Sequence, residues 1–305
     1  MKVQAVQLIL ALALAISTGA RAQSLTPRAF WPAPRGTNVL ALGYVYQEGD
    51  VLTDASLPIE DVALKMHALS AGYVYFFDLA GRTASLSVEQ PLVNASVRGL
   101  VEGEEASRVL SGRADLNVRL AVNLLGAPSM APEEFREFVK NPRPLLGASL
   151  RIVAPTGVYD PDRLVNLGSN RWAARPMLGY IRRVSRAWIL EAALGSWIYR
   201  DNDELLGQTR EQAWLYTTEL HLVRPMRLPK PDFWVSLDAT FYYGGRTRVG
   251  GAERDDLQRN SRVGLTVAIP FARRHAFKIA ASKSMLTEAR GDFWACLVAF
   301  QRAWR

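Results

Sequence analysis

Residues 113–124 alternate strictly between apolar and polar side chains, RADLNVRLAVNL. The even-numbered positions from Ala114 onward are all aliphatic, whereas Asp115, Asn117 and Arg119 lie between them. On a helix, positions two apart differ by about 200°, so the aliphatic residues would scatter around the axis. On a strand they share one face. The pattern therefore predicts a strand of about 11 residues, well above the usual 5–6, with one aliphatic and one polar face.

The same alternation recurs along the chain and predicts about twelve strands, uncertain by two. In residues 233–243, for example, apolar side chains at odd positions face away from Ser236, Asp238 and Thr240. No long helices separate the strands, so a parallel sheet is not expected. The other predicted strands are 38–47, 64–77, 82–90, 146–152, 171–183, 188–199, 212–223, 262–269, 275–284 and 292–304.

Short and long connections alternate between these strands. The tight turns are 78–81, 184–187, 226–231 and 272–274, and the long polar links are 48–63, 91–111, 156–170, 200–211 and 244–259. Such alternation is typical of an outer-membrane barrel, with short periplasmic turns and long extracellular loops. The aromatic Trp304 near the end of the last strand is also typical of these barrels. A soluble barrel or sandwich is the alternative, since its strands alternate too, but strand length, loop asymmetry and the terminal aromatic favour the membrane.

One periplasmic link, 126–144, is long where a short turn is expected. It contains PEEFREFVK, in which Pro132 and two glutamates precede Phe135 and Phe138 at helical spacing. The pattern predicts a short amphipathic helix. This helix either packs beneath the barrel or gates its periplasmic mouth, and the sequence leaves both open.

The N-terminus predicts a secretory signal peptide over residues 1–22. Lys2 precedes nine apolar residues, 8–16, and an Ala-Arg-Ala cleavage pattern ends at Ala22. Nine residues are far fewer than the ~20 that span a bilayer. Residues 23–37 are then expected to form a periplasmic segment, and 38–305 the barrel.

The formal charge falls from +8 to +6 without Lys2 and Arg21. Cys296 is the sole cysteine, so an intramolecular disulfide is excluded.

The polar faces of the strands predict a set of charged side chains that point into the lumen. Both signs are present, so the set either forms paired charges that fill a narrow barrel or lines an aqueous pore and tunes its selectivity. A twelve-stranded barrel lies between filled eight-stranded barrels and open porins, and either interpretation fits. The predicted luminal residues are Glu89, Asp115, Arg119, Arg151, Glu191, Glu219, His221, Asp238, Arg262 and Lys278.

An outer-membrane lipid hydrolase is an alternative from a different class. His221 and Ser169 are its candidate residues, but no Gly-x-Ser-x-Gly motif accompanies them. Neither a metal-ligand motif nor a glycine-rich phosphate loop is present, so no metal and no cofactor are predicted. The basic residues are dispersed between strands, and no nucleic-acid partner is expected.

The segment APTGVYDPDRLVNLGSNRW, residues 154–172, strongly resembles a motif of the outer-membrane transporter family named for the meta-cleavage pathway of phenol degradation. Further agreement lies at 36–38, 242–247 and 260–264, although the family's Gln-Asp-Pro is replaced by 212–214, Gln-Ala-Trp. The resemblance implies an outer-membrane β-barrel and transport. Within the motif, proline and glycine predict a loop at the outer rim. Its residues Tyr159, Asp160, Asn170, Arg171 and Trp172 either fold the loop, with Arg171 paired to Asp160 or Asp162, or contact a ligand at a constriction.

The sequence thus predicts an all-β protein: a transmembrane antiparallel barrel in the outer membrane of a Gram-negative bacterium, with one short helix in a periplasmic link. The expected partners are outer-membrane lipids, the barrel-insertion machinery and a small solute. The predicted function is passive or facilitated diffusion of small solutes, aromatic or hydrophobic compounds among them, through a polar lumen. A closed structural or adhesive barrel is the second interpretation.

Overall fold

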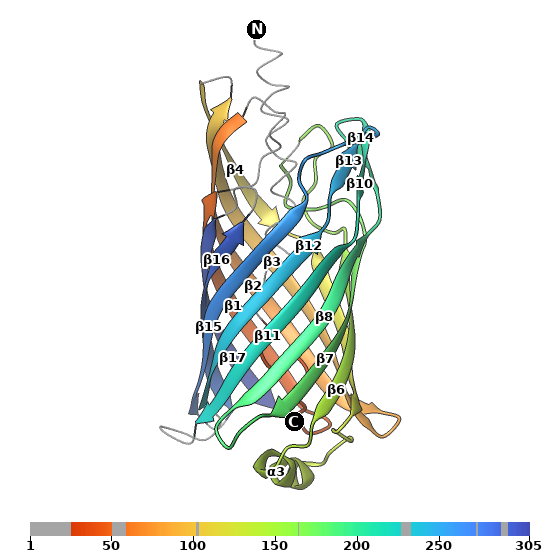
Figure 1. The fold of residues 1–305 in the computed structure, drawn as a ribbon, viewed down its shortest axis with the longest axis vertical. Coiled ribbons are helices and arrows are strands. Elements are labelled where there is room, and N and C mark those ends of the chain that lie inside the picture. The colour runs from red at the N-terminus through yellow and green to blue at the C-terminus, as the bar shows by residue number, and fades with distance from the viewer. Residues whose placement is uncertain are drawn as a thin grey trace.

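A computed structural model describes residues 26–50, 59–101, 104–163, 165–226, 233–272, 274–287 and 292–305. They form a barrel with one short helix at its lower end (Figure 1). No helix in these ranges is long and apolar enough to cross a bilayer. The predicted signal peptide and most of the predicted turn 226–231 lie outside the described residues.

Twelve strands make the wall, which confirms the predicted fold. Each pairs antiparallel with its neighbours, and pairing of β2 with β3 closes the sheet. Closure leaves no open sheet edge, as a strand barrel in hydrocarbon requires. The wall strands are β1 (Asn38–Asp50), β2 (Ile59–Leu79), β3 (Arg82–Val101), β5 (Leu116–Leu125), β6 (Leu145–Ala154), β7 (Ala173–Arg183), β8 (Ile189–Tyr199), β11 (Leu215–Met226), β12 (Phe233–Gly244), β15 (Gln258–Ala272), β16 (His275–Thr287) and β17 (Phe293–Trp304).

Links predicted as loops at the upper end contain additional strands. β3 continues past the wall and pairs with β4 (Glu104–Arg113), within the predicted link 91–111. A separate four-stranded sheet joins β9 (Asn202–Leu205), β10 (Gln208–Gln212), β13 (Thr247–Val249) and β14 (Ala252–Glu253). The four strands of this sheet have two to five residues each and are mostly polar, so hydrophobic alternation does not mark them. The lower end holds the short connections, the C-terminus and α3 (Pro132–Lys140), which is the predicted helix.

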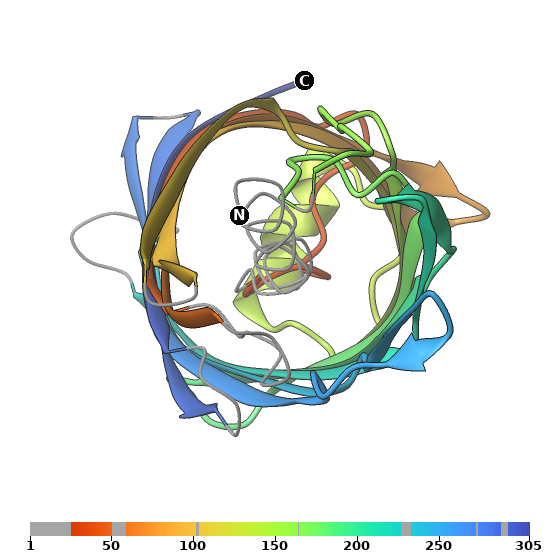
Figure 2. The ribbon, with the colours of Figure 1, turned by 90° about the horizontal axis from the view of Figure 1, so that it is seen from above.

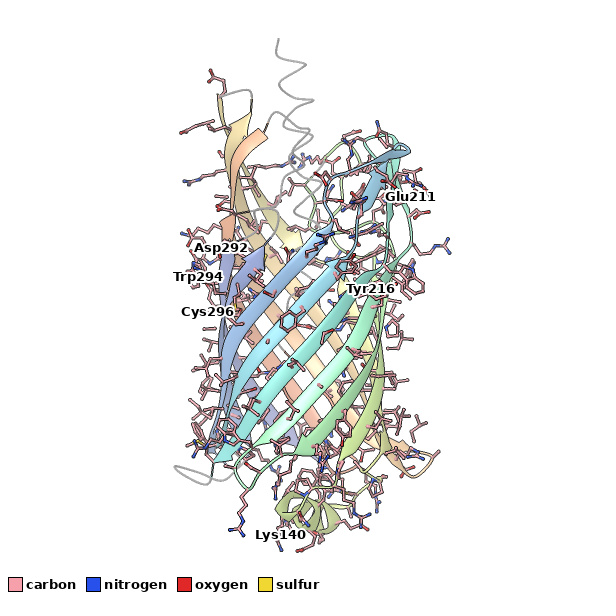
Figure 3. The ribbon with its side chains drawn as sticks, in the orientation of Figure 1. Lys140, Glu211, Tyr216, Asp292, Trp294 and Cys296 are labelled. Carbon is pink, nitrogen blue, oxygen red and sulfur yellow. The ribbon has the colours of Figure 1, made fainter. Side chains whose placement is uncertain are left out.

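The outer face of the wall is apolar. In β5, Leu120 and Leu124 are exposed, whereas Ala121 and Asn123 between them are buried. Tyr216 and Trp294 lie on the outside of the wall in Figure 3, both exposed. Exposed leucine, valine and aromatic side chains occur on all twelve wall strands except where their outer positions are small or polar, and so large an apolar surface is costly in water and expected in lipid. The aliphatic face of residues 113–124 therefore points to lipid.

Placing arginine on this apolar surface tests its contact with lipid. Leu194 lies at the middle of β8 and is 64% exposed. We expect Leu194→Arg to lower the free energy of unfolding by about 2–4 kcal/mol, the cost of arginine near the bilayer midplane. Urea unfolding of the protein folded into phospholipid vesicles measures this change.

The matched control is Val184→Arg, in the lower turn between β7 and β8, where Val184 is 52% exposed. At the membrane interface arginine costs about 0–1 kcal/mol. Equal costs for the two variants would argue that the outer face of the wall does not meet hydrocarbon.

Candidate functional site: the barrel lumen

The predicted luminal charges lie on the inner face of the wall. Their side chains alternate with the exposed apolar ones, as on Glu219 and His221 of β11, which flank exposed Leu220. Glu191, Glu219, His221, Asp238 and Arg262 are buried. Glu89, Arg119, Arg151 and Lys278 are half-buried on their strands, and Asp115 is buried at the upper rim, just before β5.

A polar network on β7, β11, β12 and β15 occupies the inner wall. Arg175 Nη2 donates to Glu219 Oε1 at 2.6 Å, and both side chains are 2% exposed. His221 Nδ1 lies 2.8 Å from Asp238 Oδ1. Asp238 also accepts hydrogen bonds from Ser236 and Thr266, each at 2.6 Å. Buried charges are tolerated when they are paired and hydrogen-bonded in this way.

The chain before β1 enters the lumen. We call Thr26–Trp31 the luminal segment; Figure 2 shows this start of the described chain, in red, inside the ring of strands. Thr26 Oγ1 donates to Glu219 Oε2 at 2.8 Å, and the backbone N–H of Arg28 donates to Glu191 Oε2 at 2.7 Å. The luminal segment therefore shares the carboxylates of the wall network.

A phenylalanine of the luminal segment fits against two glycines of the wall. Gly147 and Gly179 are directly opposite each other on β6 and β7. A Cβ on Gly147 would lie 2.4 Å from the Phe30 ring, and one on Gly179 would lie 2.3 Å from it. Both distances are far below van der Waals contact, so the absence of a side chain at these two positions makes room for Phe30. Arg119 also holds the segment, since its Nη1 donates to the Ala29 carbonyl at 3.1 Å.

The lower end of the luminal segment reaches α3. Trp31 lies against Phe138, with ring centroids 6.1 Å apart, and Phe138 stacks on Phe135. The apolar side of the helix thus packs against the chain inside the barrel. Residues 23–37 were predicted to form a periplasmic segment; of these, 26–30 contact the inner wall of the barrel and Trp31 contacts the helix.

Arginine side chains in the lumen lie over aromatic rings. The guanidinium of Arg28 is 4.3 Å from the ring centroid of Trp31 and 5.4 Å from that of Trp234. Arg175 lies 5.5 Å from Trp197, which is buried on β8. Such contacts orient planar cations on planar rings. The lumen therefore offers cationic and aromatic surfaces side by side.

The upper rim is built on Asp115. Its Oδ1 accepts the Gly157 N–H at 2.8 Å, and its Oδ2 accepts the Ser169 N–H at 3.0 Å and the Ser169 hydroxyl at 2.5 Å. Both ends of the motif loop 155–172 are thereby fastened to one carboxylate. Asp115 thus organises the loop, although the sequence assigned it to the solute pathway.

The other residues of the motif hold the loop together and attach it to its neighbours. Arg171 is buried, donates to Gln212 and lies 4.6 Å from the ring of Tyr199. The predicted partner of Arg171 was Asp160 or Asp162; the ion pair of Asp160 is with Arg163 instead. Asn170 bonds Asn202 and Glu204 in β9, and the Tyr159 hydroxyl accepts from Asn202. Burial raises the pKa of the Tyr159 phenol. Trp172 is 53% exposed.

Removing the Asp115 carboxylate should release the motif loop. In Asp115→Ala the N–H groups of Gly157 and Ser169 lose their acceptor, and each buried donor left unpaired costs about 1–3 kcal/mol. We expect faster trypsin cleavage after the exposed Arg163, measured by mass spectrometry on the folded protein in vesicles. Asp162→Ala, an exposed carboxylate in the same loop, is the control and should cleave at the wild-type rate. An unchanged rate for Asp115→Ala would mean that other contacts fix the loop.

The structure also adds residues that sequence reasoning missed. Arg175 is central to the network, but the alternation of residues 171–183 is weakened by Pro176 and by two arginines at the end of the strand. The luminal segment has no periodicity at all, and its partner Glu219 is 193 positions away from Thr26. Phe30 and Trp31, two large aromatic residues in the non-periodic stretch before β1, were the one feature of the sequence that pointed to it.

The two candidate hydrolase residues have different partners. His221 lies between two carboxylates, Asp238 at 2.8 Å and Glu219 at 3.6 Å. The Ser169 hydroxyl donates to Asp115 in the rim loop. No group of three or more potential metal ligands occurs in the described part of the chain.

Comparison with known proteins agrees with this architecture. Residues 46–291 match the family model described as "Putative MetA-pathway of phenol degradation". No curated protein matches the chain. Among solved structures, the COG4313 outer membrane channel from Pseudomonas putida F1 is 18% identical, with a TM-score of 0.73 over 92% of this chain and 100% of that chain. The transport unit of the autotransporter AIDA-I from Escherichia coli is 9% identical, with a TM-score of 0.53 over 99% and 97%. These likenesses establish the fold.

Proposed function

Because this chain belongs to the MetA-pathway of phenol degradation family, we propose that it is an outer-membrane channel through which small aromatic anions diffuse. One observation carries the proposal: three arginines form a row across the inner wall. Arg119 of β5 is directly opposite Arg151 of β6, which is directly opposite Arg175 of β7. Like charges directly opposite each other on neighbouring strands destabilise a sheet. Three arginines in a row lower the stability of the sheet, and we attribute their presence to a function, the attraction of an anionic solute.

The central arginine of the row is available to a solute. Arg175 is paired with Glu219, and Arg119 donates to the luminal segment. Arg151 has neither a hydrogen bond nor an ion pair within the described part of the chain. Its guanidinium can present a two-pronged donor to a carboxylate or phenolate, a geometry that favours planar anions.

The aromatic rings beside the row support the aromatic part of the proposal. Trp197 flanks Arg175, and Phe30 flanks Arg119 at 5.0 Å. A solute with a ring and an acidic group would find a stacking surface and a counter-charge together. Aliphatic anions of the same size would interact with the arginine charges but would not stack on the rings.

In this proposal the luminal segment controls passage. The contacts of Thr26–Phe30 described above lead to β5–β8, β11 and β12. These strands include the three that carry the arginine row, and we place the pathway beside the segment, along that row. Movement of the segment, or of the helix α3 beneath Trp31, would widen it.

The test is flux into liposomes that contain the refolded full chain. We expect benzoate to enter faster than cyclohexanecarboxylate, which has the same charge and no aromatic face, and faster than neutral benzyl alcohol relative to protein-free liposomes. Arg151→Gln should lower benzoate flux severalfold. Arg113→Gln, an exposed arginine on β4, is the charge-matched control and should have no effect.

Equal flux of benzoate and cyclohexanecarboxylate would contradict the proposed preference for aromatic anions. Absence of flux for every solute, from folded protein with and without its luminal segment, would favour a closed structural barrel. Lipid hydrolysis that disappears in His221→Ala would instead favour the hydrolase.

A further inference from the structure

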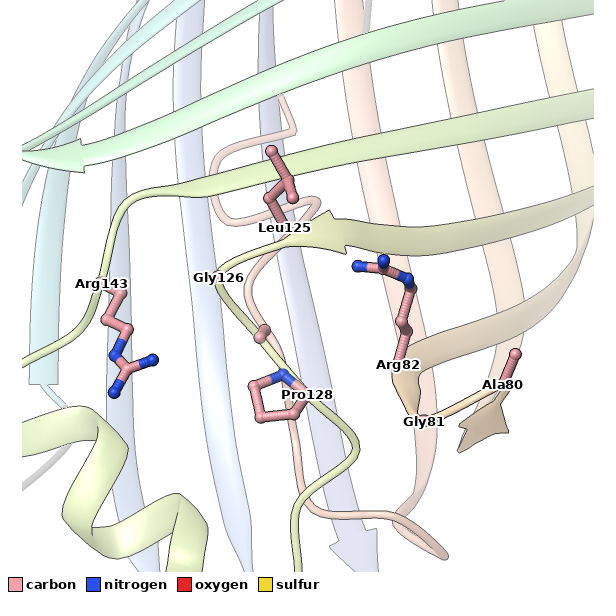
Figure 4. Close-up of a pocket in the computed structure, with 8 residues that line it drawn as sticks. Ala80, Gly81, Arg82, Leu125, Gly126, Pro128 and Arg143 are labelled. Carbon is pink, nitrogen blue, oxygen red and sulfur yellow. The ribbon is translucent and has the colours of Figure 1, made fainter.

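A pocket of about 390 Å³ lies at the lower rim of the barrel, outside the lumen network. It is bounded by the β2–β3 turn and by the first residues of the link that follows β5 (Figure 4). A Cβ on Gly126 would lie 2.0 Å from the Pro144 carbonyl oxygen, so the two ends of the link 126–144 meet here. This close approach brings Arg143 to the same pocket as Arg82.

The two arginines give the pocket its chemistry. Figure 4 shows Arg82 and Arg143 on either side of the 126–128 segment. Both side chains are exposed, and within the described ranges neither has an ion pair or a hydrogen bond. The carboxylate at the adjoining turn, Asp78, accepts the Gly81 N–H at 3.0 Å instead. Among the described residues, those that line the pocket include no acidic side chain.

The register of β2 and β3 shows at which level of the membrane the pocket lies. Leu86 is opposite Tyr75, Ala84 is opposite Phe77, and Arg82 is opposite Leu79. The exposed Tyr75 stacks on Phe77, at the level where aromatic residues mark the membrane interface. Arg82 therefore lies two residue pairs beyond Phe77, at headgroup level.

Apolar surface extends from the pocket toward the bilayer. Leu125 lines the pocket and is 59% exposed, and the neighbouring Leu79 is 42% exposed. The two arginines are complementary to the anionic headgroup of a lipid, and the exposed leucine is complementary to its acyl chain. The same rim carries further exposed arginines, including Arg224, which lies 5.5 Å from the Trp188 ring.

We propose that this pocket binds an anionic phospholipid of the periplasmic leaflet. Arg82 and Arg143 hold the phosphodiester by charge-assisted hydrogen bonds, and an acyl chain lies along Leu125. Paired guanidinium groups suit phosphate oxygens, and basic pockets at the membrane surface recognise anionic headgroups.

Native mass spectrometry of the full chain in detergent tests the site. We expect phosphatidylglycerol to remain bound to the wild type more than phosphatidylcholine does. The double variant Arg82→Gln/Arg143→Gln should lose most of the bound phosphatidylglycerol. The matched control is Arg182→Gln/Arg186→Gln, which removes two exposed arginines from another hairpin of the same rim.

Equal losses in the two double variants would overturn the proposal, because they would indicate general attraction to a basic rim. Displacement of the lipid by inorganic phosphate at equal concentration would also overturn it and would assign the pocket to a free anion. Benzoate flux and far-UV circular dichroism of the pocket variant should equal those of the wild type. They show that the barrel is folded, and they keep this test separate from the test of transport.

Discussion

Replacing Gly147 and Gly179 by alanine should raise the ion conductance of the barrel severalfold. Each new methyl group would overlap the Phe30 ring, at 2.4 Å and 2.3 Å from its carbon atoms. The wall backbone cannot shift outward easily, because both positions are in hydrogen-bonded strands, directly opposite each other. The luminal segment must therefore move, and Phe30 is its one buried aromatic residue. Single-channel recording in planar bilayers measures the change.

Three comparisons make this result specific to the segment. Gly72→Ala is the matched control, because a Cβ there would lie no nearer than 3.8 Å to any neighbouring atom. Phe30→Ala should also raise conductance, because it removes the ring that holds the luminal segment against these two glycines. Adding the glycine substitutions to a chain that lacks residues 26–31 should change nothing further. Wild-type conductance in both glycine variants would mean that the luminal segment does not limit the pathway.

The wall of this barrel could be predicted from sequence because its two faces meet different solvents. Each strand places alternate residues in lipid and in a polar lumen, so chemistry repeats with a period of two. For the same reason, positions such as Glu219, His221 and Asp238 could be assigned to the lumen before any contact was known. The alternation of polarity along the strands and of length among the links predicted the antiparallel order of the sheet and its even number of strands.

The lumen's contents could not be predicted in this way. Glu219 shows that a carboxylate faces inward, but not that Arg175 and Thr26 both bind it. These contacts depend on how the closed wall brings distant strands together. Asp115 illustrates the same limit. Its place in the alternating pattern predicted a luminal charge, whereas its position just before β5 makes it the anchor of the rim loop.

The largest loss of stability is expected from Glu219→Gln. This change leaves the Arg175 guanidinium buried without its counter-charge, while the shape of the side chain is kept. Removing one partner of a buried ion pair typically costs about 3–5 kcal/mol, because the remaining charge is uncompensated. Thr26 would also lose the ionised acceptor that binds it at 2.8 Å. Urea unfolding in phospholipid vesicles measures the loss.

Glu133→Gln provides the control for removing a paired glutamate. Its partner Arg136 is 3.3 Å away on α3, and the two side chains are 75% and 69% exposed. Exposed pairs contribute about 0–1 kcal/mol, so this variant should unfold nearly as the wild type does. The double variant Glu219→Gln/Arg175→Met should recover part of the stability, because no buried charge is then left unpaired. A loss below about 1 kcal/mol for Glu219→Gln would instead mean that water reaches Arg175 and screens its charge. The inner wall would then behave as a hydrated surface, and the arginine row would have to attract its anion through water rather than by direct contact.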